Sequence, residues 1–360
     1  MKKKALRLGV AGMIRGKAVL EDFLGERDVV LRAVADTNVD RLRRASRDFA
    51  AMGVEDLHAD PSLEALLADR EVDAVYLATD KPYHTRHAIM ALAAGKHVLS
   101  EIPTVGSLDE ARALREAVAA HPSLKYMAAE NAIYFPFVDE WRKLIAAGEL
   151  GEIVYAEGEY MHARGPHTPP ADPSHWRVTM DAIEYLTHSL APLLSLLEDR
   201  CVSVTAMSPD QNRQNPWRRG KELGAALFRT EKGRVIRILI CFGACVGFAH
   251  NYRVLGTHGS LATDPTTSFG EAQTYARFLS RPDSVEAPIA IPVGTAYDGV
   301  RSGHGGCDRR MMGAFVRAVL DDTPSPVDVD AGIRMSLPGV IAREAARTGE
   351  TLPIPDERTL

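Results

Sequence analysis

Short apolar runs alternate with helix-length segments through the first third of this 360-residue chain, and no other feature constrains its fold as much. Such βαβ units join parallel strands through right-handed crossovers, so residues 1–130 are predicted to form an open, doubly wound α/β domain. The predicted strands are Leu6–Ala11, Val29–Ala35, Leu57–Ala59, Val72–Ala78, His97–Leu99 and Lys125–Ala128. The predicted helices are Lys17–Leu24, Val39–Ala51, Pro61–Leu67, Pro82–Ala94 and Ser107–Ala119.

The pattern changes near Ala129, where strands begin to follow one another without helices between them. Residues 131–360 are therefore predicted to form an α+β domain with a mainly antiparallel sheet. A polar, arginine-rich segment from Pro209 to Gly220 is predicted to be a mobile surface loop. The predicted strands are Gly151–Arg164, Cys201–Met207, Leu223–Thr230, Arg234–Cys241, Tyr252–Gly256 and Ser260–Thr263, and the predicted helices are Pro136–Ala147, Met180–Leu197, Arg309–Leu320 and Ala331–Arg347.

Composition excludes several classes of protein. A formal net charge of −5 argues against nucleic-acid binding and against a basic membrane surface. No apolar run approaches the ~18 residues of a membrane span, and the basic N-terminus is interpreted as the first strand and not as a signal peptide. The His and Cys residues form no ligand-type spacing, so no metal is expected. The four cysteines fit a reducing compartment, and we expect a cytoplasmic protein.

The first glycine cluster, Gly9–Gly16 (GVAGMIRG), lies between a predicted strand and a predicted helix. A dinucleotide-binding turn has Gly-x-Gly-x-x-Gly there, so that backbone amides can approach a pyrophosphate. Ile14 occupies the second glycine position. Asp36 ends the next strand, where a carboxylate accepts hydrogen bonds from ribose hydroxyls and repels a 2′-phosphate, which favours NAD over NADP. Arg41 and Arg43 leave NADP open, and a glycine turn with an unrelated Asp is the alternative.

Several motifs in a fixed order resemble the Gfo/Idh/MocA oxidoreductase family over nearly the whole chain. They are the Gly9, Gly12 and Asp36 pattern, then ATDKPYH at 78–84, GKHVLSEIP at 95–103, a helix at 180–197 with a central His, and HGGCD at 304–308. The resemblance implies a Rossmann domain, a second domain with a large open sheet, NAD(P) and a carbohydrate-like substrate. It also implies a homo-oligomer, a dimer or tetramer, formed through that sheet. The residues predicted to contact the cofactor are Gly9, Gly12, Met13, Ile14, Asp36, Thr79, His84, Glu101, Ile102, Asn131 and Trp176.

The chain departs from the family at the loop that typically reads Glu-Lys-Pro, because it has Ile102 at the Lys position. In the family, this Lys acts on the reacting hydroxyl together with an Asp and a His four residues apart on one helix. Glu184 and His188 match that pair in spacing. An alkyl side chain cannot take a proton, so a plain alcohol dehydrogenase would lack a principal catalytic group.

The sequence YLTHS at 185–189 resembles the Tyr-x-Thr-His-Ser stretch of NAD-dependent glycosidases in this superfamily, which also lack the Lys. The segment 157–162 (EGEYMH) looks like another of their strands. In those enzymes the sugar 3-hydroxyl is oxidised, the ketone acidifies the C2 proton, the C1 group is eliminated, water adds, and the hydride returns. This resemblance makes Tyr160, Tyr185 and His188 candidate acid/base residues, beside Glu184. The predicted substrate-binding residues are His162, Arg177, His304 and Asp308.

Each of these residues also has a purely structural interpretation. Tyr185 is suited to packing on a sheet, Tyr160 and His162 alternate on one strand face, and the 304–308 segment is suited to helix capping. Trp176 and Arg177 are suited to pinning the preceding loop. His188 stands between Thr187 and Ser189 in an apolar helix, where buried polar atoms need partners, and this favours a functional role.

The same reasoning leaves three functions open. The first is oxidation of a pyranoside hydroxyl at C3 as part of glycoside cleavage, and the second is a simple sugar or inositol dehydrogenase. The third is a catalytically silent sugar- or cofactor-binding protein, which the missing Lys would explain. The arginines Arg164, Arg213, Arg218 and Arg219 are suited either to an acidic substituent of the substrate or to solvated surface.

Overall fold

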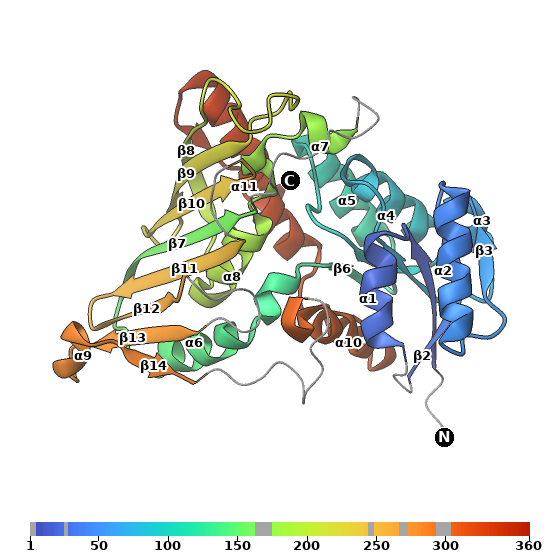
Figure 1. Cartoon of the computed structure of the whole chain (residues 1–360), viewed down its shortest axis with the longest axis horizontal. Coiled ribbons are helices and arrows are strands. Elements are labelled where there is room, and N and C mark those ends of the chain that lie inside the picture. Colours follow the sequence, from blue (N-terminus) through green and yellow to red (C-terminus); the bar gives the residue numbers. More distant parts are fainter. Residues whose placement is uncertain (1–4, 25–27, 163–174, 244–247, 266–272, 293–303) are drawn as a thin grey trace. The chain divides into compact units, whose positions relative to one another are not determined.

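A computed structural model describes residues 5–24, 28–162, 175–243, 248–265, 273–292 and 304–360 (Figure 1). The chain divides into two compact units. The first consists of Met1–Glu130, Asp308–Ile333 and Leu360, and the second of Asn131–Cys307 and Arg334–Thr359.

The first unit is built on a six-stranded sheet with the order β3-β2-β1-β4-β5-β6, and every pair in it is parallel. The central strands are buried on both faces, which explains why they appear in the sequence as continuous apolar runs. This sheet confirms the predicted doubly wound domain. The strands are β1 (Leu6–Ala11), β2 (Val29–Ala35), β3 (His58–Asp60), β4 (Ala74–Leu77), β5 (His97–Ser100) and β6 (Tyr126–Ala128).

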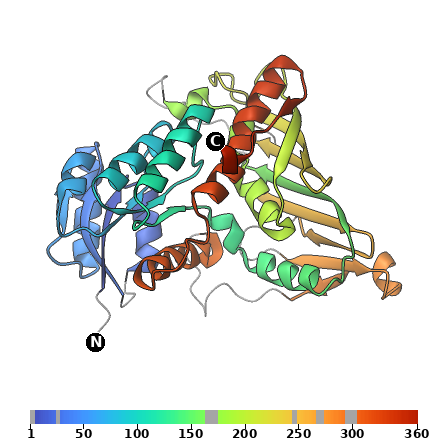
Figure 2. The same cartoon turned by 180° about the vertical axis from the view of Figure 1, so that it is seen from behind.

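Helices alternate with these strands, and α4 and α5 pack side by side on one face of the sheet (Figure 2). Polar caps fix their starts: the side chain of Ser62 accepts from the Ala65 amide at α3, and that of Ser107 accepts from the Glu110 amide at α5. The helix predicted to begin at Pro61 therefore begins two residues later. The helices are α1 (Arg15–Phe23), α2 (Val39–Ala51), α3 (Leu63–Ala68), η1 (Lys81–Tyr83), α4 (His84–Ala93), α5 (Leu108–Ala120) and α10 (Cys307–Leu320).

The second unit is built on a nine-stranded sheet with the order β14-β13-β12-β11-β7-β10-β9-β8-β15. Its pairs are antiparallel except for β7 and β10, which run parallel, so the predicted mainly antiparallel sheet is confirmed. The strands are β7 (Ile153–Met161), β8 (Cys201–Met207), β9 (Leu223–Thr230), β10 (Val235–Cys241), β11 (Ala249–Gly256), β12 (Gly259–Thr263), β13 (Thr274–Phe278), β14 (Ile289–Ile291) and β15 (Leu352–Pro353).

Helix α8 lies on one face of this sheet against β7 (Figure 1). Gly158 permits the approach, because a Cβ atom there would lie 2.6 Å from the carbonyl oxygen of Ser189. The predicted continuous helix from Met180 to Leu197 is wrong, since the side chains of Asp181 and Glu184 form a capping box on a separate short helix, η3. The helices are η2 (Asn131–Tyr134), α6 (Pro136–Ala146), α7 (Trp176–Thr179), η3 (Ala182–Tyr185), α8 (Thr187–Leu197), α9 (Asp283–Glu286), η5 (His304–Gly306), α11 (Val329–Thr348) and η6 (Glu357–Thr359).

Residues 308–333 belong to the first unit, although the sequence pattern placed them in the second. Several contacts hold them there: the amide of Ala128 donates to the carbonyl of Val327 at 2.9 Å, Arg115 pairs with Asp330 at 2.8 Å, and Lys125 pairs with Asp322 at 2.7 Å. The segment is helical and has no strand that would assign it to either sheet. Its packing partners therefore decide where it belongs.

Helices long and apolar enough to cross a membrane are absent from the described part of the chain. Cys201 is a buried free thiol, Cys241 and Cys307 are also buried, and Cys245 lies outside the described residues.

Candidate functional site

The turn between β1 and α1 has the geometry of a dinucleotide-binding loop. Gly12 has φ +95°, and a Cβ atom there would lie 2.1 Å from the carbonyl oxygen of Ala78, so only glycine fits. At Gly16 a Cβ atom would lie 2.6 Å from a methyl group of Val10. Ile14, at the position of the missing glycine, is 70% exposed at the start of α1. Its side chain therefore points to solvent and leaves the close backbone approach intact.

Asp36 closes this loop from the end of β2. Its carboxylate accepts hydrogen bonds of 2.8 Å from the amides of Met13 and Asn38. Arg41 reaches both carboxylate oxygens, at 3.2 and 3.3 Å, from the first turn of α2. The carboxylate predicted to bind the ribose is thus buried, lies beside the glycine turn and is paired with a cation.

A network of charged and polar side chains surrounds Glu101, the residue that follows β5. The hydroxyl of buried Tyr76 donates to Glu101, and Arg15 Nε donates to the same carboxylate at 3.0 Å. The Arg15 guanidinium also binds fully buried Asp308 through two hydrogen bonds, of 2.8 and 2.6 Å. Burial and the charge of Glu101 raise the pKa of Tyr76 well above its ordinary value, so the phenol stays protonated. Glu101 and Asp308 thus hold the start of α1 through Arg15.

Ile102, which follows Glu101, is 5% exposed. The loop that contains it is fixed by His84, whose ring nitrogens lie 3.0 Å from the Pro103 carbonyl oxygen and 2.9 Å from that of Thr79. His84 therefore joins the loops that follow β4 and β5. These predicted cofactor-site residues shape the carboxyl edge of the first sheet, where doubly wound folds bind ligands.

The second unit gathers the predicted acid/base side chains into one cluster. The half-buried ring of His188 lies 5.6 Å from the ring of Tyr160 and 5.4 Å from that of Tyr185, centroid to centroid. The two tyrosine rings stack at 6.0 Å, and Phe242 lies within 6.1 Å of both. His162 extends the cluster from the end of β7, at 5.5 Å from Tyr160. Two phenols and an imidazole whose rings are in direct contact can transfer protons to and from a single bound molecule.

Sequence reasoning missed His250, which belongs to the same cluster. The register of β7 and β11 places it directly opposite Tyr160, and the two rings lie 4.4 Å apart. Burial lowers the pKa of His250 well below its ordinary value, and His188, His304 and His162 lower it further. The signal was present in the sequence, because His250 and Tyr252 alternate as strand residues do, but the strand was predicted to begin only at Tyr252.

Glu130 is a second missed residue, a fully buried carboxylate at the end of the segment that follows β6. Its neighbour Asn131, predicted to contact the cofactor, is buried at the start of η2. A charged residue two positions after a predicted strand of a parallel sheet was the signal that could have found Glu130.

Glu184 does not extend from a continuous helix toward His188. Its carboxylate accepts a hydrogen bond of 3.0 Å from the Asp181 amide and pairs with Arg343 at 2.9 Å. The predicted i and i+4 relationship fails here because the chain leaves η3 before α8 begins. Glu184 therefore holds the start of the Tyr185–His188 segment, and its acid/base role stays a prediction.

The remaining predicted residues divide between the units. Asp308 is in the first unit, and His304, with a φ of +53°, is in the second. Trp176 and Arg177 open α7 in the second unit, with the guanidinium 4.2 Å from the centre of the Trp ring. The predicted cofactor-site residues that lie in the first unit are Gly9, Gly12, Met13, Ile14, Asp36, Thr79, His84, Glu101 and Ile102.

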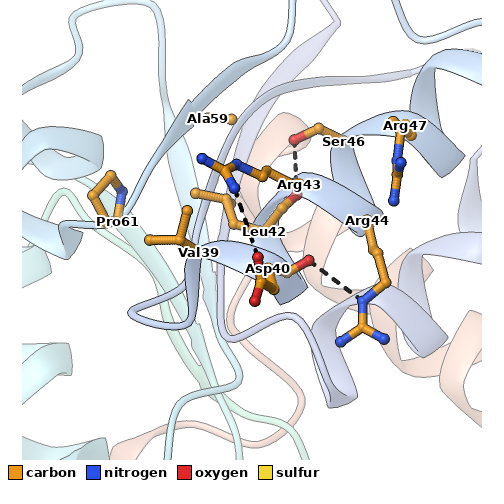
Figure 3. A pocket seen from close by; sticks show the side chains of 9 residues that line it. All are labelled: Val39, Asp40, Leu42, Arg43, Arg44, Ser46, Arg47, Ala59 and Pro61. Atoms are coloured by element: carbon orange, nitrogen blue, oxygen red, sulfur yellow. Dashed lines mark hydrogen bonds and ion pairs between the residues drawn. The ribbon is translucent and has the colours of Figure 1, made fainter.

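An open hollow of about 790 Å³ lies between α2 and the end of β3, where Ala59 and Pro61 line it (Figure 3). Arg43, Arg44 and Arg47 line it, together with Asp40, which pairs with Arg43 at 3.7 Å. None of the glycine-turn residues line it, so it is separate from the dinucleotide loop. Among the described residues, no group of three or more His, Cys, Asp or Glu side chains is arranged to hold a metal ion.

A parallel sheet with a glycine turn and a carboxylate at the end of β2 defines a dinucleotide-binding oxidoreductase domain. Family comparison agrees: residues 6–128 match the model described as "Oxidoreductase family, NAD-binding Rossmann fold", and residues 138–262 match the "GFO/IDH/MocA C-terminal domain". The chain belongs to the Gfo/Idh/MocA oxidoreductase family. Its first unit is an NAD-binding Rossmann domain, and the turn at Gly12 with Asp36 beside it fits that cofactor.

Two curated relatives span most of the chain. A "Glycosyl hydrolase family 109 protein" of Solibacter usitatus is 26% identical over an alignment of 382 positions, gaps included. The alignment covers 96% of this chain and 86% of the relative. The dTDP-3,4-didehydro-2,6-dideoxy-alpha-D-glucose 3-reductase of Streptomyces violaceoruber is 29% identical over 300 residues, covering 79% and 80%. Among solved structures, levoglucosan dehydrogenase in complex with NADH and levoglucosan superposes with a TM-score of 0.83 at 20% identity, covering 98% and 100%. This last likeness shows the fold.

Proposed function

We propose that this NAD-linked carbohydrate oxidoreductase oxidises the C3 hydroxyl of a pyranoside and uses the resulting ketone to cleave the glycosidic bond, with no net redox change. The observation that carries the proposal is the cluster of Tyr160, Tyr185 and His188 in a chain with Ile102 in place of the family Lys. The similarity to glycosyl hydrolase family 109 proteins over most of the chain supports it.

Bound NAD supplies a hydride acceptor when C3 is oxidised and a hydride donor when the ketone is reduced. We assign His188 to take the proton of the C3 hydroxyl, because an imidazole gains and loses a proton near neutral pH. Tyr160 and Tyr185 are assigned the proton transfers at C2 and at the departing C1 oxygen. His250 stays neutral beside Tyr160, so it adds no competing positive charge to the cluster.

Isotope exchange tests this sequence of steps. Aryl glycosides are incubated with the enzyme in D2O, with and without added NAD, and the released sugar is examined by NMR and mass spectrometry. We expect cleavage without accumulation of NADH, and deuterium at C2 of the released sugar. Cleavage without C2 deuterium in the presence of a saturating cofactor would rule out elimination through a ketone.

A simple sugar dehydrogenase is the second candidate, and the reductase of Streptomyces violaceoruber among the relatives favours it. In that case His188 acts alone as the base, and free sugars or polyols give NADH in a 1:1 ratio to oxidised product. A silent binding protein would show neither NADH nor deuterium exchange, and His188→Ala would leave its ligand affinity unchanged.

We also propose that the protein forms a dimer or tetramer through the outer face of the nine-stranded sheet. Leu227, 52% exposed on β9, pairs in register with Arg237 of β10, which binds Glu157 of β7 at 3.0 Å. Such a mixed apolar and charged face suits a self-complementary contact. Light scattering of the wild type and Leu227→Asp tests this. The buried free thiol of Cys201 fits our proposal of a cytoplasmic location.

A further inference from the structure

Arg218 lies one aromatic ring away from the Tyr160–Tyr185–His188 cluster. Its guanidinium carbon is 5.5 Å from the centre of the Phe242 ring. Phe242 in turn lies 5.9 Å from Tyr160 and 6.1 Å from Tyr185, centroid to centroid. A substituent of a sugar held against the two tyrosines is therefore within the reach of an arginine side chain.

The loop that carries Arg218 was predicted to be a mobile surface segment; the structure shows a loop there, and hydrogen bonds define its course. Glu222 organises the loop, because its carboxylate accepts hydrogen bonds from the amides of Arg213, Gln214 and Asn215 at 2.7 to 3.1 Å. The side-chain amide of Asn212 donates to the carbonyls of Arg218 and Gly220. These side-chain to backbone hydrogen bonds fix the position of the Arg218 backbone.

Arg218 is poorly neutralised at this position. Its Nη2 donates to the carbonyl of Met180 at 2.8 Å, whereas its buried Nε has no hydrogen-bond partner among the described residues. Burial lowers the pKa of Arg218, and the positive charge of Arg177 lowers it further, although Glu222 and Asp181 oppose the shift. A partly buried cation with an unused donor costs free energy until an acceptor arrives.

The two carboxylates near Arg218, those of Glu222 and Asp181, accept hydrogen bonds from other groups. Glu222 is surrounded by the backbone amides described above, and Asp181 accepts a hydrogen bond of 2.6 Å from the Lys221 amide while it caps η3. Within the described ranges, the Arg218 guanidinium donates to the Met180 carbonyl and not to either carboxylate. Arg177, stacked on Trp176, adds a second positive charge near Arg218.

We propose that Arg218, assisted by Arg177, binds an anionic substituent of the substrate, namely a carboxylate or a phosphate ester carried by the sugar. The inference rests on the proposed function, because it takes the Tyr160–Tyr185–His188 cluster as the place where the sugar ring lies. A guanidinium fork matches both oxyanions through paired N–H donors. Neighbouring Arg213 and Arg219 are exposed, and we assign them to solvated surface.

The test compares three probes that differ in one substituent: a 4-nitrophenyl glucoside, the corresponding glucuronide, and the glucoside 6-phosphate, each as both anomers. Binding to the NAD-saturated enzyme is measured by calorimetry, and cleavage by nitrophenol release. The variants are Arg218→Gln, Arg218→Lys and the matched control Arg219→Gln, with circular dichroism and thermal melting to establish that each is folded.

We expect an acidic probe to bind at least tenfold more tightly than the neutral glucoside to the wild type. Arg218→Gln should lose about 10- to 100-fold of that preference, the range for a hydrogen-bonded charged pair, whereas Arg219→Gln keeps it. Arg218→Lys should retain part of it, because the charge remains and the fork is lost. The preferred acidic probe, carboxylate or phosphate, identifies the oxyanion.

Equal affinity for neutral and acidic probes, failure of every probe to bind, or equal loss in Arg218→Gln and Arg219→Gln would overturn this inference. The proposed cleavage is judged separately, by deuterium at C2. Neutral glycosides that are cleaved with exchange would leave the proposed function standing without the anion site. Arg218-dependent binding of an acidic sugar with no exchange and no NADH would leave the anion site standing alone.

Discussion

The hydroxyl of Tyr252 donates a hydrogen bond of 2.6 Å to the carbonyl oxygen of His188. Tyr252 is buried in β11, and His188 lies in the first turn of α8. The same hydroxyl lies 3.4 Å from Nδ1 of His250. One phenol thus fixes the backbone beneath the proposed base and contacts the histidine that faces Tyr160.

Replacement of Tyr252 by Phe removes this hydrogen bond and leaves the ring in place. We expect the free energy of unfolding to fall by about 1 kcal/mol. We expect kcat to fall roughly 10- to 100-fold, because a small displacement of His188 spoils the reacting geometry, with little change in KM. Urea denaturation and steady-state kinetics measure the two effects. Tyr275→Phe on β13 is the kinetic control and should leave kcat unchanged, because the Tyr275 hydroxyl bonds Asp264 and Gln273 and not the cluster. Equal kinetic losses in both variants would contradict a positioning role.

Loss of the proposed base should be far more damaging. His188→Ala is expected to reduce kcat by about 10²- to 10⁴-fold, the range for general acid–base catalysis, while NADH binding stays unchanged. Exposed His258 offers a control, since His258→Ala removes an imidazole from the same unit without touching the cluster. Retention of more than a tenth of the activity in His188→Ala would remove this residue from the mechanism.

His250 should make stability depend on pH. Its folded pKa lies well below the unfolded value of about 6.5, so the unfolded chain binds the extra proton between those two values. Unfolding free energy should therefore be unaffected by His250 above about pH 6.5. Below that it should fall with decreasing pH, by up to about 1.4 kcal/mol per unit from this group alone. Urea titrations from pH 5 to 8 should show a shallower acid slope for His250→Phe; an unchanged slope would contradict this.

Arg41 should influence the choice of cofactor. It pairs with Asp36, the carboxylate predicted to favour NAD over NADP, and its side chain is 37% exposed. A 2′-phosphate would compete with Asp36 for this guanidinium. We expect Arg41→Ala to weaken NADPH binding roughly 10-fold and to leave NADH binding equal or tighter, measured by cofactor fluorescence. Arg43→Ala, on the same helix, should change neither; equal losses for both cofactors would make Arg41 merely structural.

The Arg15–Asp308 pair should contribute to stability, because Asp308 is fully buried. Arg15→Met would leave two carboxylates, Asp308 and Glu101, without their cation, and we expect a loss of about 3 kcal/mol in unfolding free energy. Arg112→Met breaks an exposed pair with Asp109 and should cost less than about 1 kcal/mol. Denaturant unfolding of both variants at neutral pH measures the two losses of unfolding free energy. Similar small losses would contradict a stabilising role for the buried Arg15–Asp308 pair.

Local pattern was sufficient wherever a segment's own residues specify its structure. Leu6–Ala11, Val29–Ala35 and Val39–Ala51 were predicted with the observed bounds, since their apolar spacing matches one period throughout. Strands β13 and β14 escaped prediction, because short segments at a sheet edge have weak patterns. The break between η3 and α8 was missed as well, since it depends on the side chains of Asp181 and Glu184 capping a short helix within an apolar run.

The sequence by itself determined the two sheets, the glycine turn with Asp36, the absence of the family Lys at Ile102, and the Tyr and His residues available for chemistry. These depend on residue type and on spacing along the chain. Only the tertiary structure decided that His250 faces Tyr160 and that Arg218 lies beside Phe242. It also decided two ion pairs, Arg343 with Glu184 and Arg15 with Asp308. Strand register and packing bring those partners together across long sequence separations, and no local pattern encodes such contacts.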